Sequence, residues 1–243
     1  MTETLPPNPP LLQYYGDPAK RERFVRDIFD DTAPWYDAIS GLMSFGSEGR
    51  YRRQALARAG LKDGMRLLDL ATGTGAVARA ASTMTSRIVG ADASIGMLLA
   101  GRAKQRFPLV LAQGERLPLR NESFDMLTTG YALRHFADLH TLFSECRRVL
   151  RPGGRLLLLE ITRPRSAFAR AALRLHMDRI VPLLVRLRSR SRDTARLMHY
   201  YWDTIEACVP PESILGALQQ SGFADVTRHV ELGIFSEYSA LKS

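Results

Sequence analysis

The strongest chemical signal in the chain is an acidic residue inside an apolar run that leads into a glycine-rich turn, LDLATGTGA at Leu68–Ala76. Glycines let the backbone approach a ligand, and turns of this kind bind dinucleotides and other nucleosides alike. Asp69 lies four residues before Gly73, where a carboxylate repels a pyrophosphate and attracts a ligand with a sulfonium and an α-amino group. Asp92 follows Gly73 by 19 residues, in place to bind a ribose diol. We expect a cationic nucleoside here, since a turn without a ligand would leave both carboxylates without a packing purpose.

The elements that must position these residues are short apolar runs that alternate with stretches of helical spacing. From about residue 65 to 162 this alternation is typical of a parallel sheet covered by helices on both faces. We predict strands at 65–71, 87–92, 109–113, 124–129 and 155–161, and helices at 76–83, 95–107 and 139–150. After a helix at 212–221, the runs 226–232 and 235–241 predict a C-terminal antiparallel hairpin. The predicted fold class is α/β, a Rossmann-like, mostly parallel seven-stranded sheet.

Composition divides the chain into three parts. Residues 1–19 hold four prolines among the first ten positions and predict a flexible, proline-rich arm. Residues 20–60 predict an N-terminal helical cap broken by a proline and several glycines. Residues 61–243 hold the predicted sheet, which an arginine-rich insertion at about 163–205 interrupts.

The basic charge of the chain is concentrated in that insertion. Residues 163–196 contain ten arginines and two aspartates and so carry +8 of the net charge of +9. Pro182 is expected to divide the segment into two short helices, and apolar residues lie between the arginines: Phe168, Leu175, Ile180, Leu183, Leu184 and Leu187. This pattern predicts a lid on an anionic membrane surface. A solvated helical face or the contact of a homodimer is the alternative, and nucleic acid is the partner that we favour least.

Other classes of protein and site are excluded by composition. No apolar run approaches the roughly 18 to 20 residues that a membrane-spanning helix needs. Cys146 and Cys208 cannot form a disulfide framework or a zinc site on their own, and no secretory signal is visible, so a reducing cytoplasm is the expected compartment. His140, His176, His199 and His229 show no paired spacing with cysteines or carboxylates that would define a metal site, and we predict no metal.

Seven segments read together resemble the ubiquinone and menaquinone biosynthesis C-methyltransferases. The resemblance covers most of the chain, and its N-terminal YD…LMSFG segment is more specific than the glycine turn. It implies that residues 61–243 form a class I S-adenosylmethionine-dependent methyltransferase. The implied reaction methylates a ring carbon of a prenylated benzoquinol or naphthoquinol. The matching segments are FDDTAPWYDAISGLMSFG (29–46), LDLATGTG (68–75), ADASIGML (91–98), ERLPLRNESFD (115–125), LRHF (133–136), RVLRPGGRLLLLEITRP (148–164) and SGFADV (221–226).

The resemblance also implies which residues meet S-adenosylmethionine. They are Asp69, Gly73, Thr74, Gly75, Asp92, Gln113, Gly114 and Gly130. Gln113 stands where family members carry Asn or Asp, and its amide can still face the amino edge of adenine.

Further departures from the family pattern lie on the implied substrate side. Ser40 and Gly41 replace the Asn and Asp of YDxxND, Tyr51 replaces a Trp, and His135 replaces the Asn of LRNF. Such changes leave two alternatives open. One is an O- or N-methyltransferase of another phenolic or aromatic metabolite, and the other is a non-catalytic, methyltransferase-like scaffold. A peripheral position on the inner face of the membrane would suit a lipophilic quinol substrate.

The acceptor ring must be activated by the enzyme, whereas the methyl donor is already activated. Methyl transfer is an in-line displacement at an activated carbon, so the enzyme supplies alignment and a charge environment. A phenol with a pKa of about 10 must lose its proton to make the ring nucleophilic. We expect Arg134 to stabilise the phenolate, His135 to take the proton with an apparent pKa of about 6.5, and Tyr36 to position the ring. Each of the three residues also has a purely structural alternative: Arg134 caps a helix, His135 bonds a loop carbonyl, and Tyr36 is a buried tyrosine.

Overall fold

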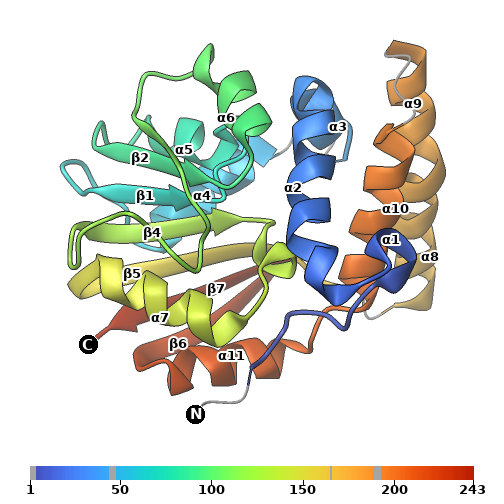
Figure 1. Cartoon of the computed structure of the whole chain (residues 1–243). Coiled ribbons are helices and arrows are strands. Elements are labelled where there is room, and N and C mark those ends of the chain that lie inside the picture. The colour runs from blue at the N-terminus through green and yellow to red at the C-terminus, as the bar shows by residue number, and fades with distance from the viewer. Residues whose placement is uncertain (1–3, 44–47, 165, 189–192) are drawn as a thin grey trace.

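A sheet forms the centre of the molecule (Figure 1). The computed structural model describes residues 4–43, 48–164, 166–188 and 193–243, and within these ranges the sheet has seven strands in the order β3-β2-β1-β4-β5-β7-β6. The first five strands are parallel, while β7 is antiparallel to both β5 and β6. The predicted fold class is confirmed, including the C-terminal hairpin. The strands are β1 (Leu67–Leu70), β2 (Ile88–Asp92), β3 (Leu109–Leu111), β4 (Phe124–Gly130), β5 (Leu150–Ile161), β6 (Phe223–Glu231) and β7 (Phe235–Lys242).

Helices cover both faces of the sheet because the strands are apolar on both sides. Side chains alternate along a strand, so Leu67 packs with α4 (Glu48–Arg58) and α5 (Ala76–Ala81) on one face. Its neighbour Leu68 packs on the other face with α7 (Leu139–Val149) and α11 (Pro211–Gln220). A further helix, α6 (Ile95–Arg102), packs beside β2 and β3.

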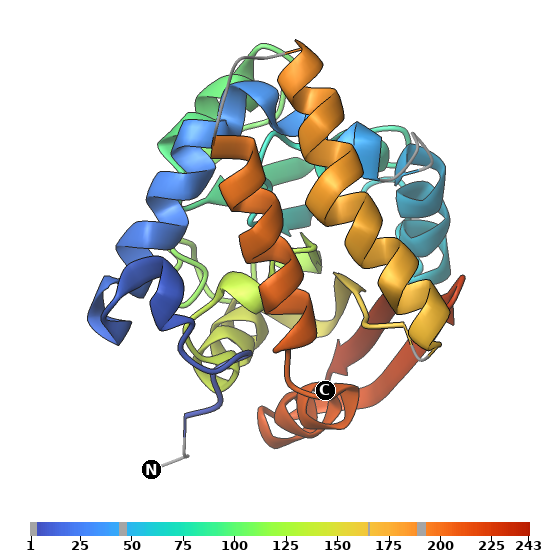
Figure 2. The ribbon, with the colours of Figure 1, turned by 90° about the vertical axis from the view of Figure 1, so that its right-hand side faces the viewer.

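A separate layer of helices covers the carboxyl ends of the parallel strands. Figure 1 shows α2 (Arg21–Thr32) and α3 (Tyr36–Met43) between the sheet and three outer helical segments. Figure 2 shows these outer segments, α8 (Ala167–Leu175), α9 (Val181–Arg188) and α10 (Asp193–Glu206), lying across the surface. The layer has its own apolar core, to which Ile39, Val181 and Trp202 contribute. None of the helices in the described ranges is long and apolar enough to cross a membrane.

The N-terminal segment differs from the predicted flexible arm, because residues 4–19 are held against the domain. The Leu5 N–H donates to Asp138 at 2.6 Å, and the Pro7 carbonyl accepts from the Val209 N–H at 2.9 Å. The side chain of Asn8 is buried and donates to the Arg134 carbonyl at 2.7 Å. Two short helices follow, α1 (Leu12–Tyr15) and η1 (Pro18–Lys20). An extended proline-rich segment makes no hydrogen bonds within itself, so its carbonyl groups are free to accept hydrogen bonds from the domain, as Pro7 does here.

The arginine-rich insertion also differs from its prediction. Pro182 does not divide it into two helices, because α8 passes through a π-helical turn, η4 (His176–Ile180), directly into α9. Pro182 has no N–H to donate, and the widened turn before it changes the bonding that an α-helix would require there. Phe168 and Leu183 are 84% and 60% exposed on this segment. The side chain of Leu187 lies outside the described residues.

Candidate active site

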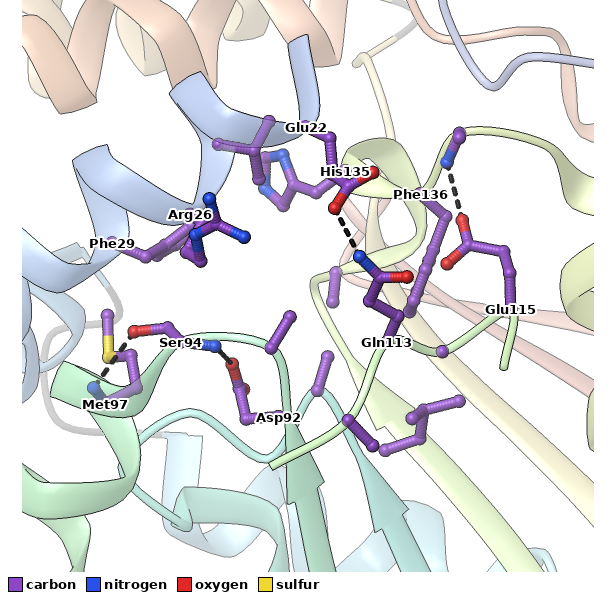
Figure 3. Close-up of a pocket in the computed structure, with 18 of the residues that line it drawn as sticks. Glu22, Arg26, Phe29, Asp92, Ser94, Met97, Gln113, Glu115, His135 and Phe136 are labelled. Carbon is purple, nitrogen blue, oxygen red and sulfur yellow. Dashed lines mark hydrogen bonds between the residues drawn. The ribbon is translucent and has the colours of Figure 1, made fainter. Parts of the chain in front are cut away.

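A cavity of about 840 Å³ lies where the carboxyl ends of the parallel strands face α2 (Figure 3). Loops that follow β1, β2, β3 and β4 line one side, and α2 lines the other. The chain order reverses where β1 lies between β2 and β4, and open α/β sheets bind ligands in the crevice at such a point. The volume falls within the roughly 300–1,000 Å³ of small-molecule sites. This cavity is the candidate active site.

Five predicted cofactor residues line the cavity, and two of them are bonded together. The Gly73 N–H donates to Asp92 Oδ2 at 2.7 Å, and the Ser94 N–H donates to Asp92 Oδ1 at 2.8 Å. Gly73 has a φ of 55°, and a Cβ there would meet no heavy atom within 4 Å, so open space adjoins its backbone. Burial raises the pKa of Asp92 to about 6, against the opposing hydrogen bonds from Ser94 and Gly73. The five lining residues are Gly73, Asp92, Gln113, Gly114 and Gly130.

Two of these glycines are required by close packing at the cavity wall. A Cβ on Gly114 would lie 2.3 Å from the ring of Phe136, and a Cβ on Gly130 would lie 2.6 Å from Val77. Any larger residue would push these side chains or narrow the cavity. The wall therefore consists of backbone at these two positions.

Asp69 does not line the cavity, which corrects its predicted contact with the cationic ligand. Its side chain is buried and accepts hydrogen bonds from Thr72 Oγ1 at 2.7 Å, Thr128 Oγ1 at 3.0 Å and the Ala78 N–H at 3.1 Å. Burial raises the pKa of Asp69 to about 6, which these hydrogen bonds oppose. The carboxylate therefore braces the turn between β1 and α5 from behind.

Thr74 and Gly75 also lie behind the lining. The Thr74 hydroxyl donates to Asp37 Oδ1 of α3. Gly75 precedes α5 with a φ of 87°, and a Cβ there would overlap the Gln105 side chain. Both residues shape the turn that presents Gly73.

His135 lines the cavity as a neutral imidazole. Its Nδ1 lies 3.2 Å from the Tyr200 hydroxyl, whereas its buried Nε2 has no hydrogen-bond partner among the described residues. Burial first, and then the charges of Arg134 and Arg21, hold the pKa of His135 well below 6.5. The imidazole is therefore ready to accept or donate one hydrogen bond in the cavity, and the pKa of about 6.5 expected from the sequence is corrected to a lower one.

Aromatic side chains surround this imidazole. Its ring centroid lies 5.4 Å from that of Tyr200 and 5.5 Å from that of Tyr201, both stacked, and 5.1 Å from that of Phe29 in an edge-to-face arrangement. The Tyr36 and Tyr201 hydroxyls are 2.9 Å apart, and both residues line the cavity. Tyr36 and His135, two of the three predicted catalytic residues, thus meet on one aromatic wall, which suits a planar ring.

Arg134 does not line the main cavity, which corrects its predicted role beside a phenolate. Its side chain is 1% exposed, and Nε donates to Glu160 at 2.9 Å. Nη1 donates to Thr204 at 3.1 Å and Nη2 to the Tyr131 carbonyl at 3.3 Å. Every nitrogen of the guanidinium is engaged within the protein, so Arg134 fastens η3 (Leu133–His135) to β5 and α10.

The model of the ubiE/COQ5 methyltransferase family matches residues 17–242. The chain belongs to this family. It is 36% identical over 228 residues to the ubiquinone/menaquinone biosynthesis C-methyltransferase UbiE of Syntrophotalea carbinolica, covering 90% of this chain and 94% of that protein. It is 32% identical over 231 residues to the demethylmenaquinone methyltransferase of Roseiflexus sp., covering 93% and 96%. The family assignment makes the chain an S-adenosylmethionine-dependent methyltransferase.

Solved structures show that the fold is that of class I methyltransferases. An S-adenosylmethionine-dependent methyltransferase from Aquifex aeolicus superposes with a TM-score of 0.59 at 17% identity, covering 93% of this chain and 99% of the other. Phosphoethanolamine N-methyltransferase 2 from Haemonchus contortus, in complex with S-adenosylhomocysteine, has a TM-score of 0.61 at 17% identity, covering 90% and 60%.

The cavity fits the cofactor of the family. The open space beside Gly73 accepts a ligand against the backbone, and Asp92 presents a carboxylate at the end of β2, where a ribose diol can donate to it. Glu22, Glu115 and Asp138 add acidic side chains to the lining, which complements a positively charged nucleoside.

The departures from the family pattern are not gathered in one place. His135 lines the main cavity, and Ser40 lines a small adjoining cavity between α3 and β5. Tyr51 is buried on α4 and packs on Phe235 at 4.9 Å, away from both cavities. Gly41 lies on α3 and lines neither cavity. Part of the matching LMSFG segment, residues 44–46, lies outside the described residues.

Sequence reasoning missed the residues of α2. Glu22, Arg26 and Phe29 lie on one face of this helix and line the cavity (Figure 3). Glu22 accepts a hydrogen bond from Gln113 Nε2, which joins the helix to the predicted adenine contact. Arg26 points into the cavity and makes no hydrogen bond or ion pair with any described residue. The spacing of three and four residues identifies one helical face, but the sequence has no signal for where that face points.

Proposed function

We propose that the protein methylates a ring carbon of a lipophilic quinol, a prenylated benzoquinol or naphthoquinol. The relatives named above carry out methylation in quinone biosynthesis, which supports this acceptor class. The observation that carries the proposal is His135, a neutral imidazole with an unpartnered Nε2, facing the same cavity as Asp92 and Gly73. An acceptor ring on this aromatic wall would lie beside the predicted methyl donor.

Within this proposal each lining residue has a separate task. Bound S-adenosylmethionine supplies a methyl group activated by its sulfonium. Asp92 would accept hydrogen bonds from the ribose of the bound cofactor, and the Gly73 backbone would lie against its methionine moiety. His135 Nε2 takes the proton of the acceptor hydroxyl, either directly or through a water, while Tyr36 positions the ring. The phenolate would make the ring carbon electron-rich toward the activated methyl group; the methylated ring carbon would then lose its own proton to solvent, and His135 would return a proton to the ring oxygen.

Arg26 takes over the task that the sequence assigned to Arg134. Its guanidinium points into the cavity from α2, one turn before Phe29 of the aromatic wall. A cation at this position would stabilise a phenolate oxygen. Because Arg26 is exposed to solvent, its guanidinium has little desolvation penalty in the enzyme without substrate. Arg26→Gln should therefore lower kcat more than it changes the affinity for the cofactor.

The test of the acceptor class uses the intact protein, methyl-labelled S-adenosylmethionine and a quinol-containing lipid extract. A labelled product that keeps its methyl group through acid hydrolysis and has lost one ring proton supports C-methylation of a quinol. Label on oxygen or nitrogen would replace this proposal with the O- or N-methyltransferase alternative. Cofactor binding without any labelled product would favour a non-catalytic scaffold.

We also propose that the α8–α9 segment docks on an anionic membrane surface. Phe168, Leu175 and Leu183 are exposed along it, and the exposed Arg170, Arg174 and Arg179 lie between them. Each arginine near an anionic bilayer contributes about 1 kcal/mol at low salt, and the apolar side chains add burial in the headgroup region. A membrane position would bring the cavity close to a lipophilic substrate.

Vesicle sedimentation tests this surface. At low salt the protein should sediment with vesicles that contain phosphatidylserine and remain in the supernatant with pure phosphatidylcholine. Phe168→Ser/Leu183→Ser should lose this binding, whereas Leu99→Ser, an exposed leucine on α6 beside β2 and β3, should keep it. If the protein is a dimer that these variants dissociate, the α8–α9 surface is instead the contact with a second copy. If it is a monomer that binds neither kind of vesicle, the surface is exposed to solvent.

A further inference from the structure

The helical cap is tied to the cofactor side of the cavity through Asp30 of α2. Its Oδ1 accepts hydrogen bonds from the Ser94 hydroxyl and from the Gly96 N–H, the latter at 2.8 Å. Helices α2 and α6 are in close contact at this point, since a Cβ on Gly96 of α6 would lie 2.9 Å from the Cα of Asp30 on α2. Ser94 also caps α6, so the first tie ends two residues after Asp92.

A second tie is made by Asp37 in the first turn of α3. Its Oδ1 accepts from the Thr74 hydroxyl, next to Gly73 in the glycine turn. Its Oδ2 lies 2.7 Å from Lys104 Nζ and 3.6 Å from an Arg79 guanidinium nitrogen. Burial alone would raise the pKa of Asp37, but the hydrogen bonds from Lys104 and Thr74 outweigh it and lower the pKa. The carboxylate therefore stays ionised and bonded at neutral pH.

The two ties meet at Asp92. The Ser94 N–H donates to one of its carboxylate oxygens, and the Gly73 N–H donates to the other. A chain of hydrogen-bonded residues thus runs from Asp30 through Asp92 to the turn and on to Asp37. Neither Asp30 nor Asp37 lines the cavity, so neither can touch a ligand there in this arrangement.

The cap helices carry part of the acceptor wall. Phe29 directly precedes Asp30 on α2, and Tyr36 directly precedes Asp37 on α3. Both aromatic residues line the cavity, and their rings are 6.1 Å apart. A change in how the cap lies on the turn would therefore move the acceptor wall.

We propose that Asp30 and Asp37 are positioning residues that couple cofactor binding to acceptor binding. A ligand held by Asp92 and Gly73 restrains the chain of hydrogen bonds and so holds Phe29 and Tyr36 in the arrangement that receives the ring. This inference rests on the proposed acceptor site for its second ligand. Coupling of this kind is reciprocal, so each ligand must raise the affinity for the other by the same factor.

Calorimetry measures the coupling with S-adenosylhomocysteine and 1,4-dihydroxynaphthalene as probes. The affinity for each probe should rise by about 5- to 150-fold in the presence of the other, the usual range for two coupled sites. In Asp30→Ala/Asp37→Ala, which removes the acceptor oxygens of both ties, the factor should fall close to 1. Asp31→Ala removes a carboxylate from an exposed position on α2 and should keep the full factor. A double variant with the full coupling factor would overturn the proposal.

Hydrogen exchange provides a test that needs no acceptor, so a wrong acceptor class and a wrong coupling can be distinguished. Saturating S-adenosylhomocysteine should slow amide exchange across α2 and α3 in the natural protein and in Asp31→Ala, but not in the double variant. Thr74→Val removes the hydroxyl that bonds Asp37 and should lose the protection of α3, whereas Thr74→Ser should keep it. Equal protection of the cap in all variants would overturn the proposal even if the naphthalenediol does not bind.

Discussion

Replacing Arg134 with methionine is expected to destabilise the fold. The guanidinium is 1% exposed and donates to Glu160 at 2.9 Å, while the carboxylate of Glu160 is itself buried. Without Arg134, Glu160 keeps only the N–H groups of Leu133 and Ile161 as partners among the described residues. Breaking a buried ion pair by removing one partner costs about 3–5 kcal/mol. For a chain of this length each kcal/mol shifts Tm by about 2–4 °C, so Tm should fall by roughly 6–20 °C.

Thermal unfolding of four proteins separates this structural role from a catalytic one. Arg134→Met and Glu160→Gln should each lower Tm, while the double variant, which buries no unpaired charge, should recover about half of the loss of Arg134→Met or more. Arg120→Met, on an exposed loop, serves as the control and should change stability by about 0.5 kcal/mol or less. An Arg134→Met protein with unchanged Tm and strongly reduced turnover would refute this reasoning and return Arg134 to the reaction.

Three further outcomes concern the cavity wall. Asp92→Asn should weaken S-adenosylmethionine binding by about 1.5–3 kcal/mol, roughly 10- to 150-fold by calorimetry. Because burial raises the pKa of Asp92 to about 6, the affinity of the natural protein for the cofactor should fall as the pH drops below 6, and Asp92→Asn should lose most of this pH dependence. The low pKa of His135 keeps the imidazole neutral, so kcat should show no step at about pH 6.5, and such a step would contradict the assignment. Gly114→Ala should cost about 1–3 kcal/mol of stability or cofactor affinity, since its Cβ would overlap Phe136, whereas Gly216→Ala on α11, with nothing within 4 Å, should be neutral or stabilising.

The sequence by itself determined the order of the elements and the floor of the site. Strands with apolar residues on both faces, separated by amphipathic helices, require a sheet covered on both sides, and the glycine turn after β1 follows from that order. Asp92 lines the cavity because a carboxylate at the end of a parallel strand lies at the carboxyl edge whatever the loops do, while its contact with a ribose stays a prediction. These features depend on residues close together in the chain.

Only the tertiary structure decided which polar side chains face the cavity. Arg134 and His135 are neighbours in sequence, yet the guanidinium turns to Glu160 and Thr204, which lie 26 and 70 residues further along, while the imidazole turns inward. The proline-rich segment is held by Asp138, 133 residues from Leu5, and Arg26 faces the site because Asp30 and Asp37 fasten the cap across the turn. Local patterns specify a helix and its faces, but the partner that buries or exposes each face comes from distant parts of the chain and appears only once the layers pack.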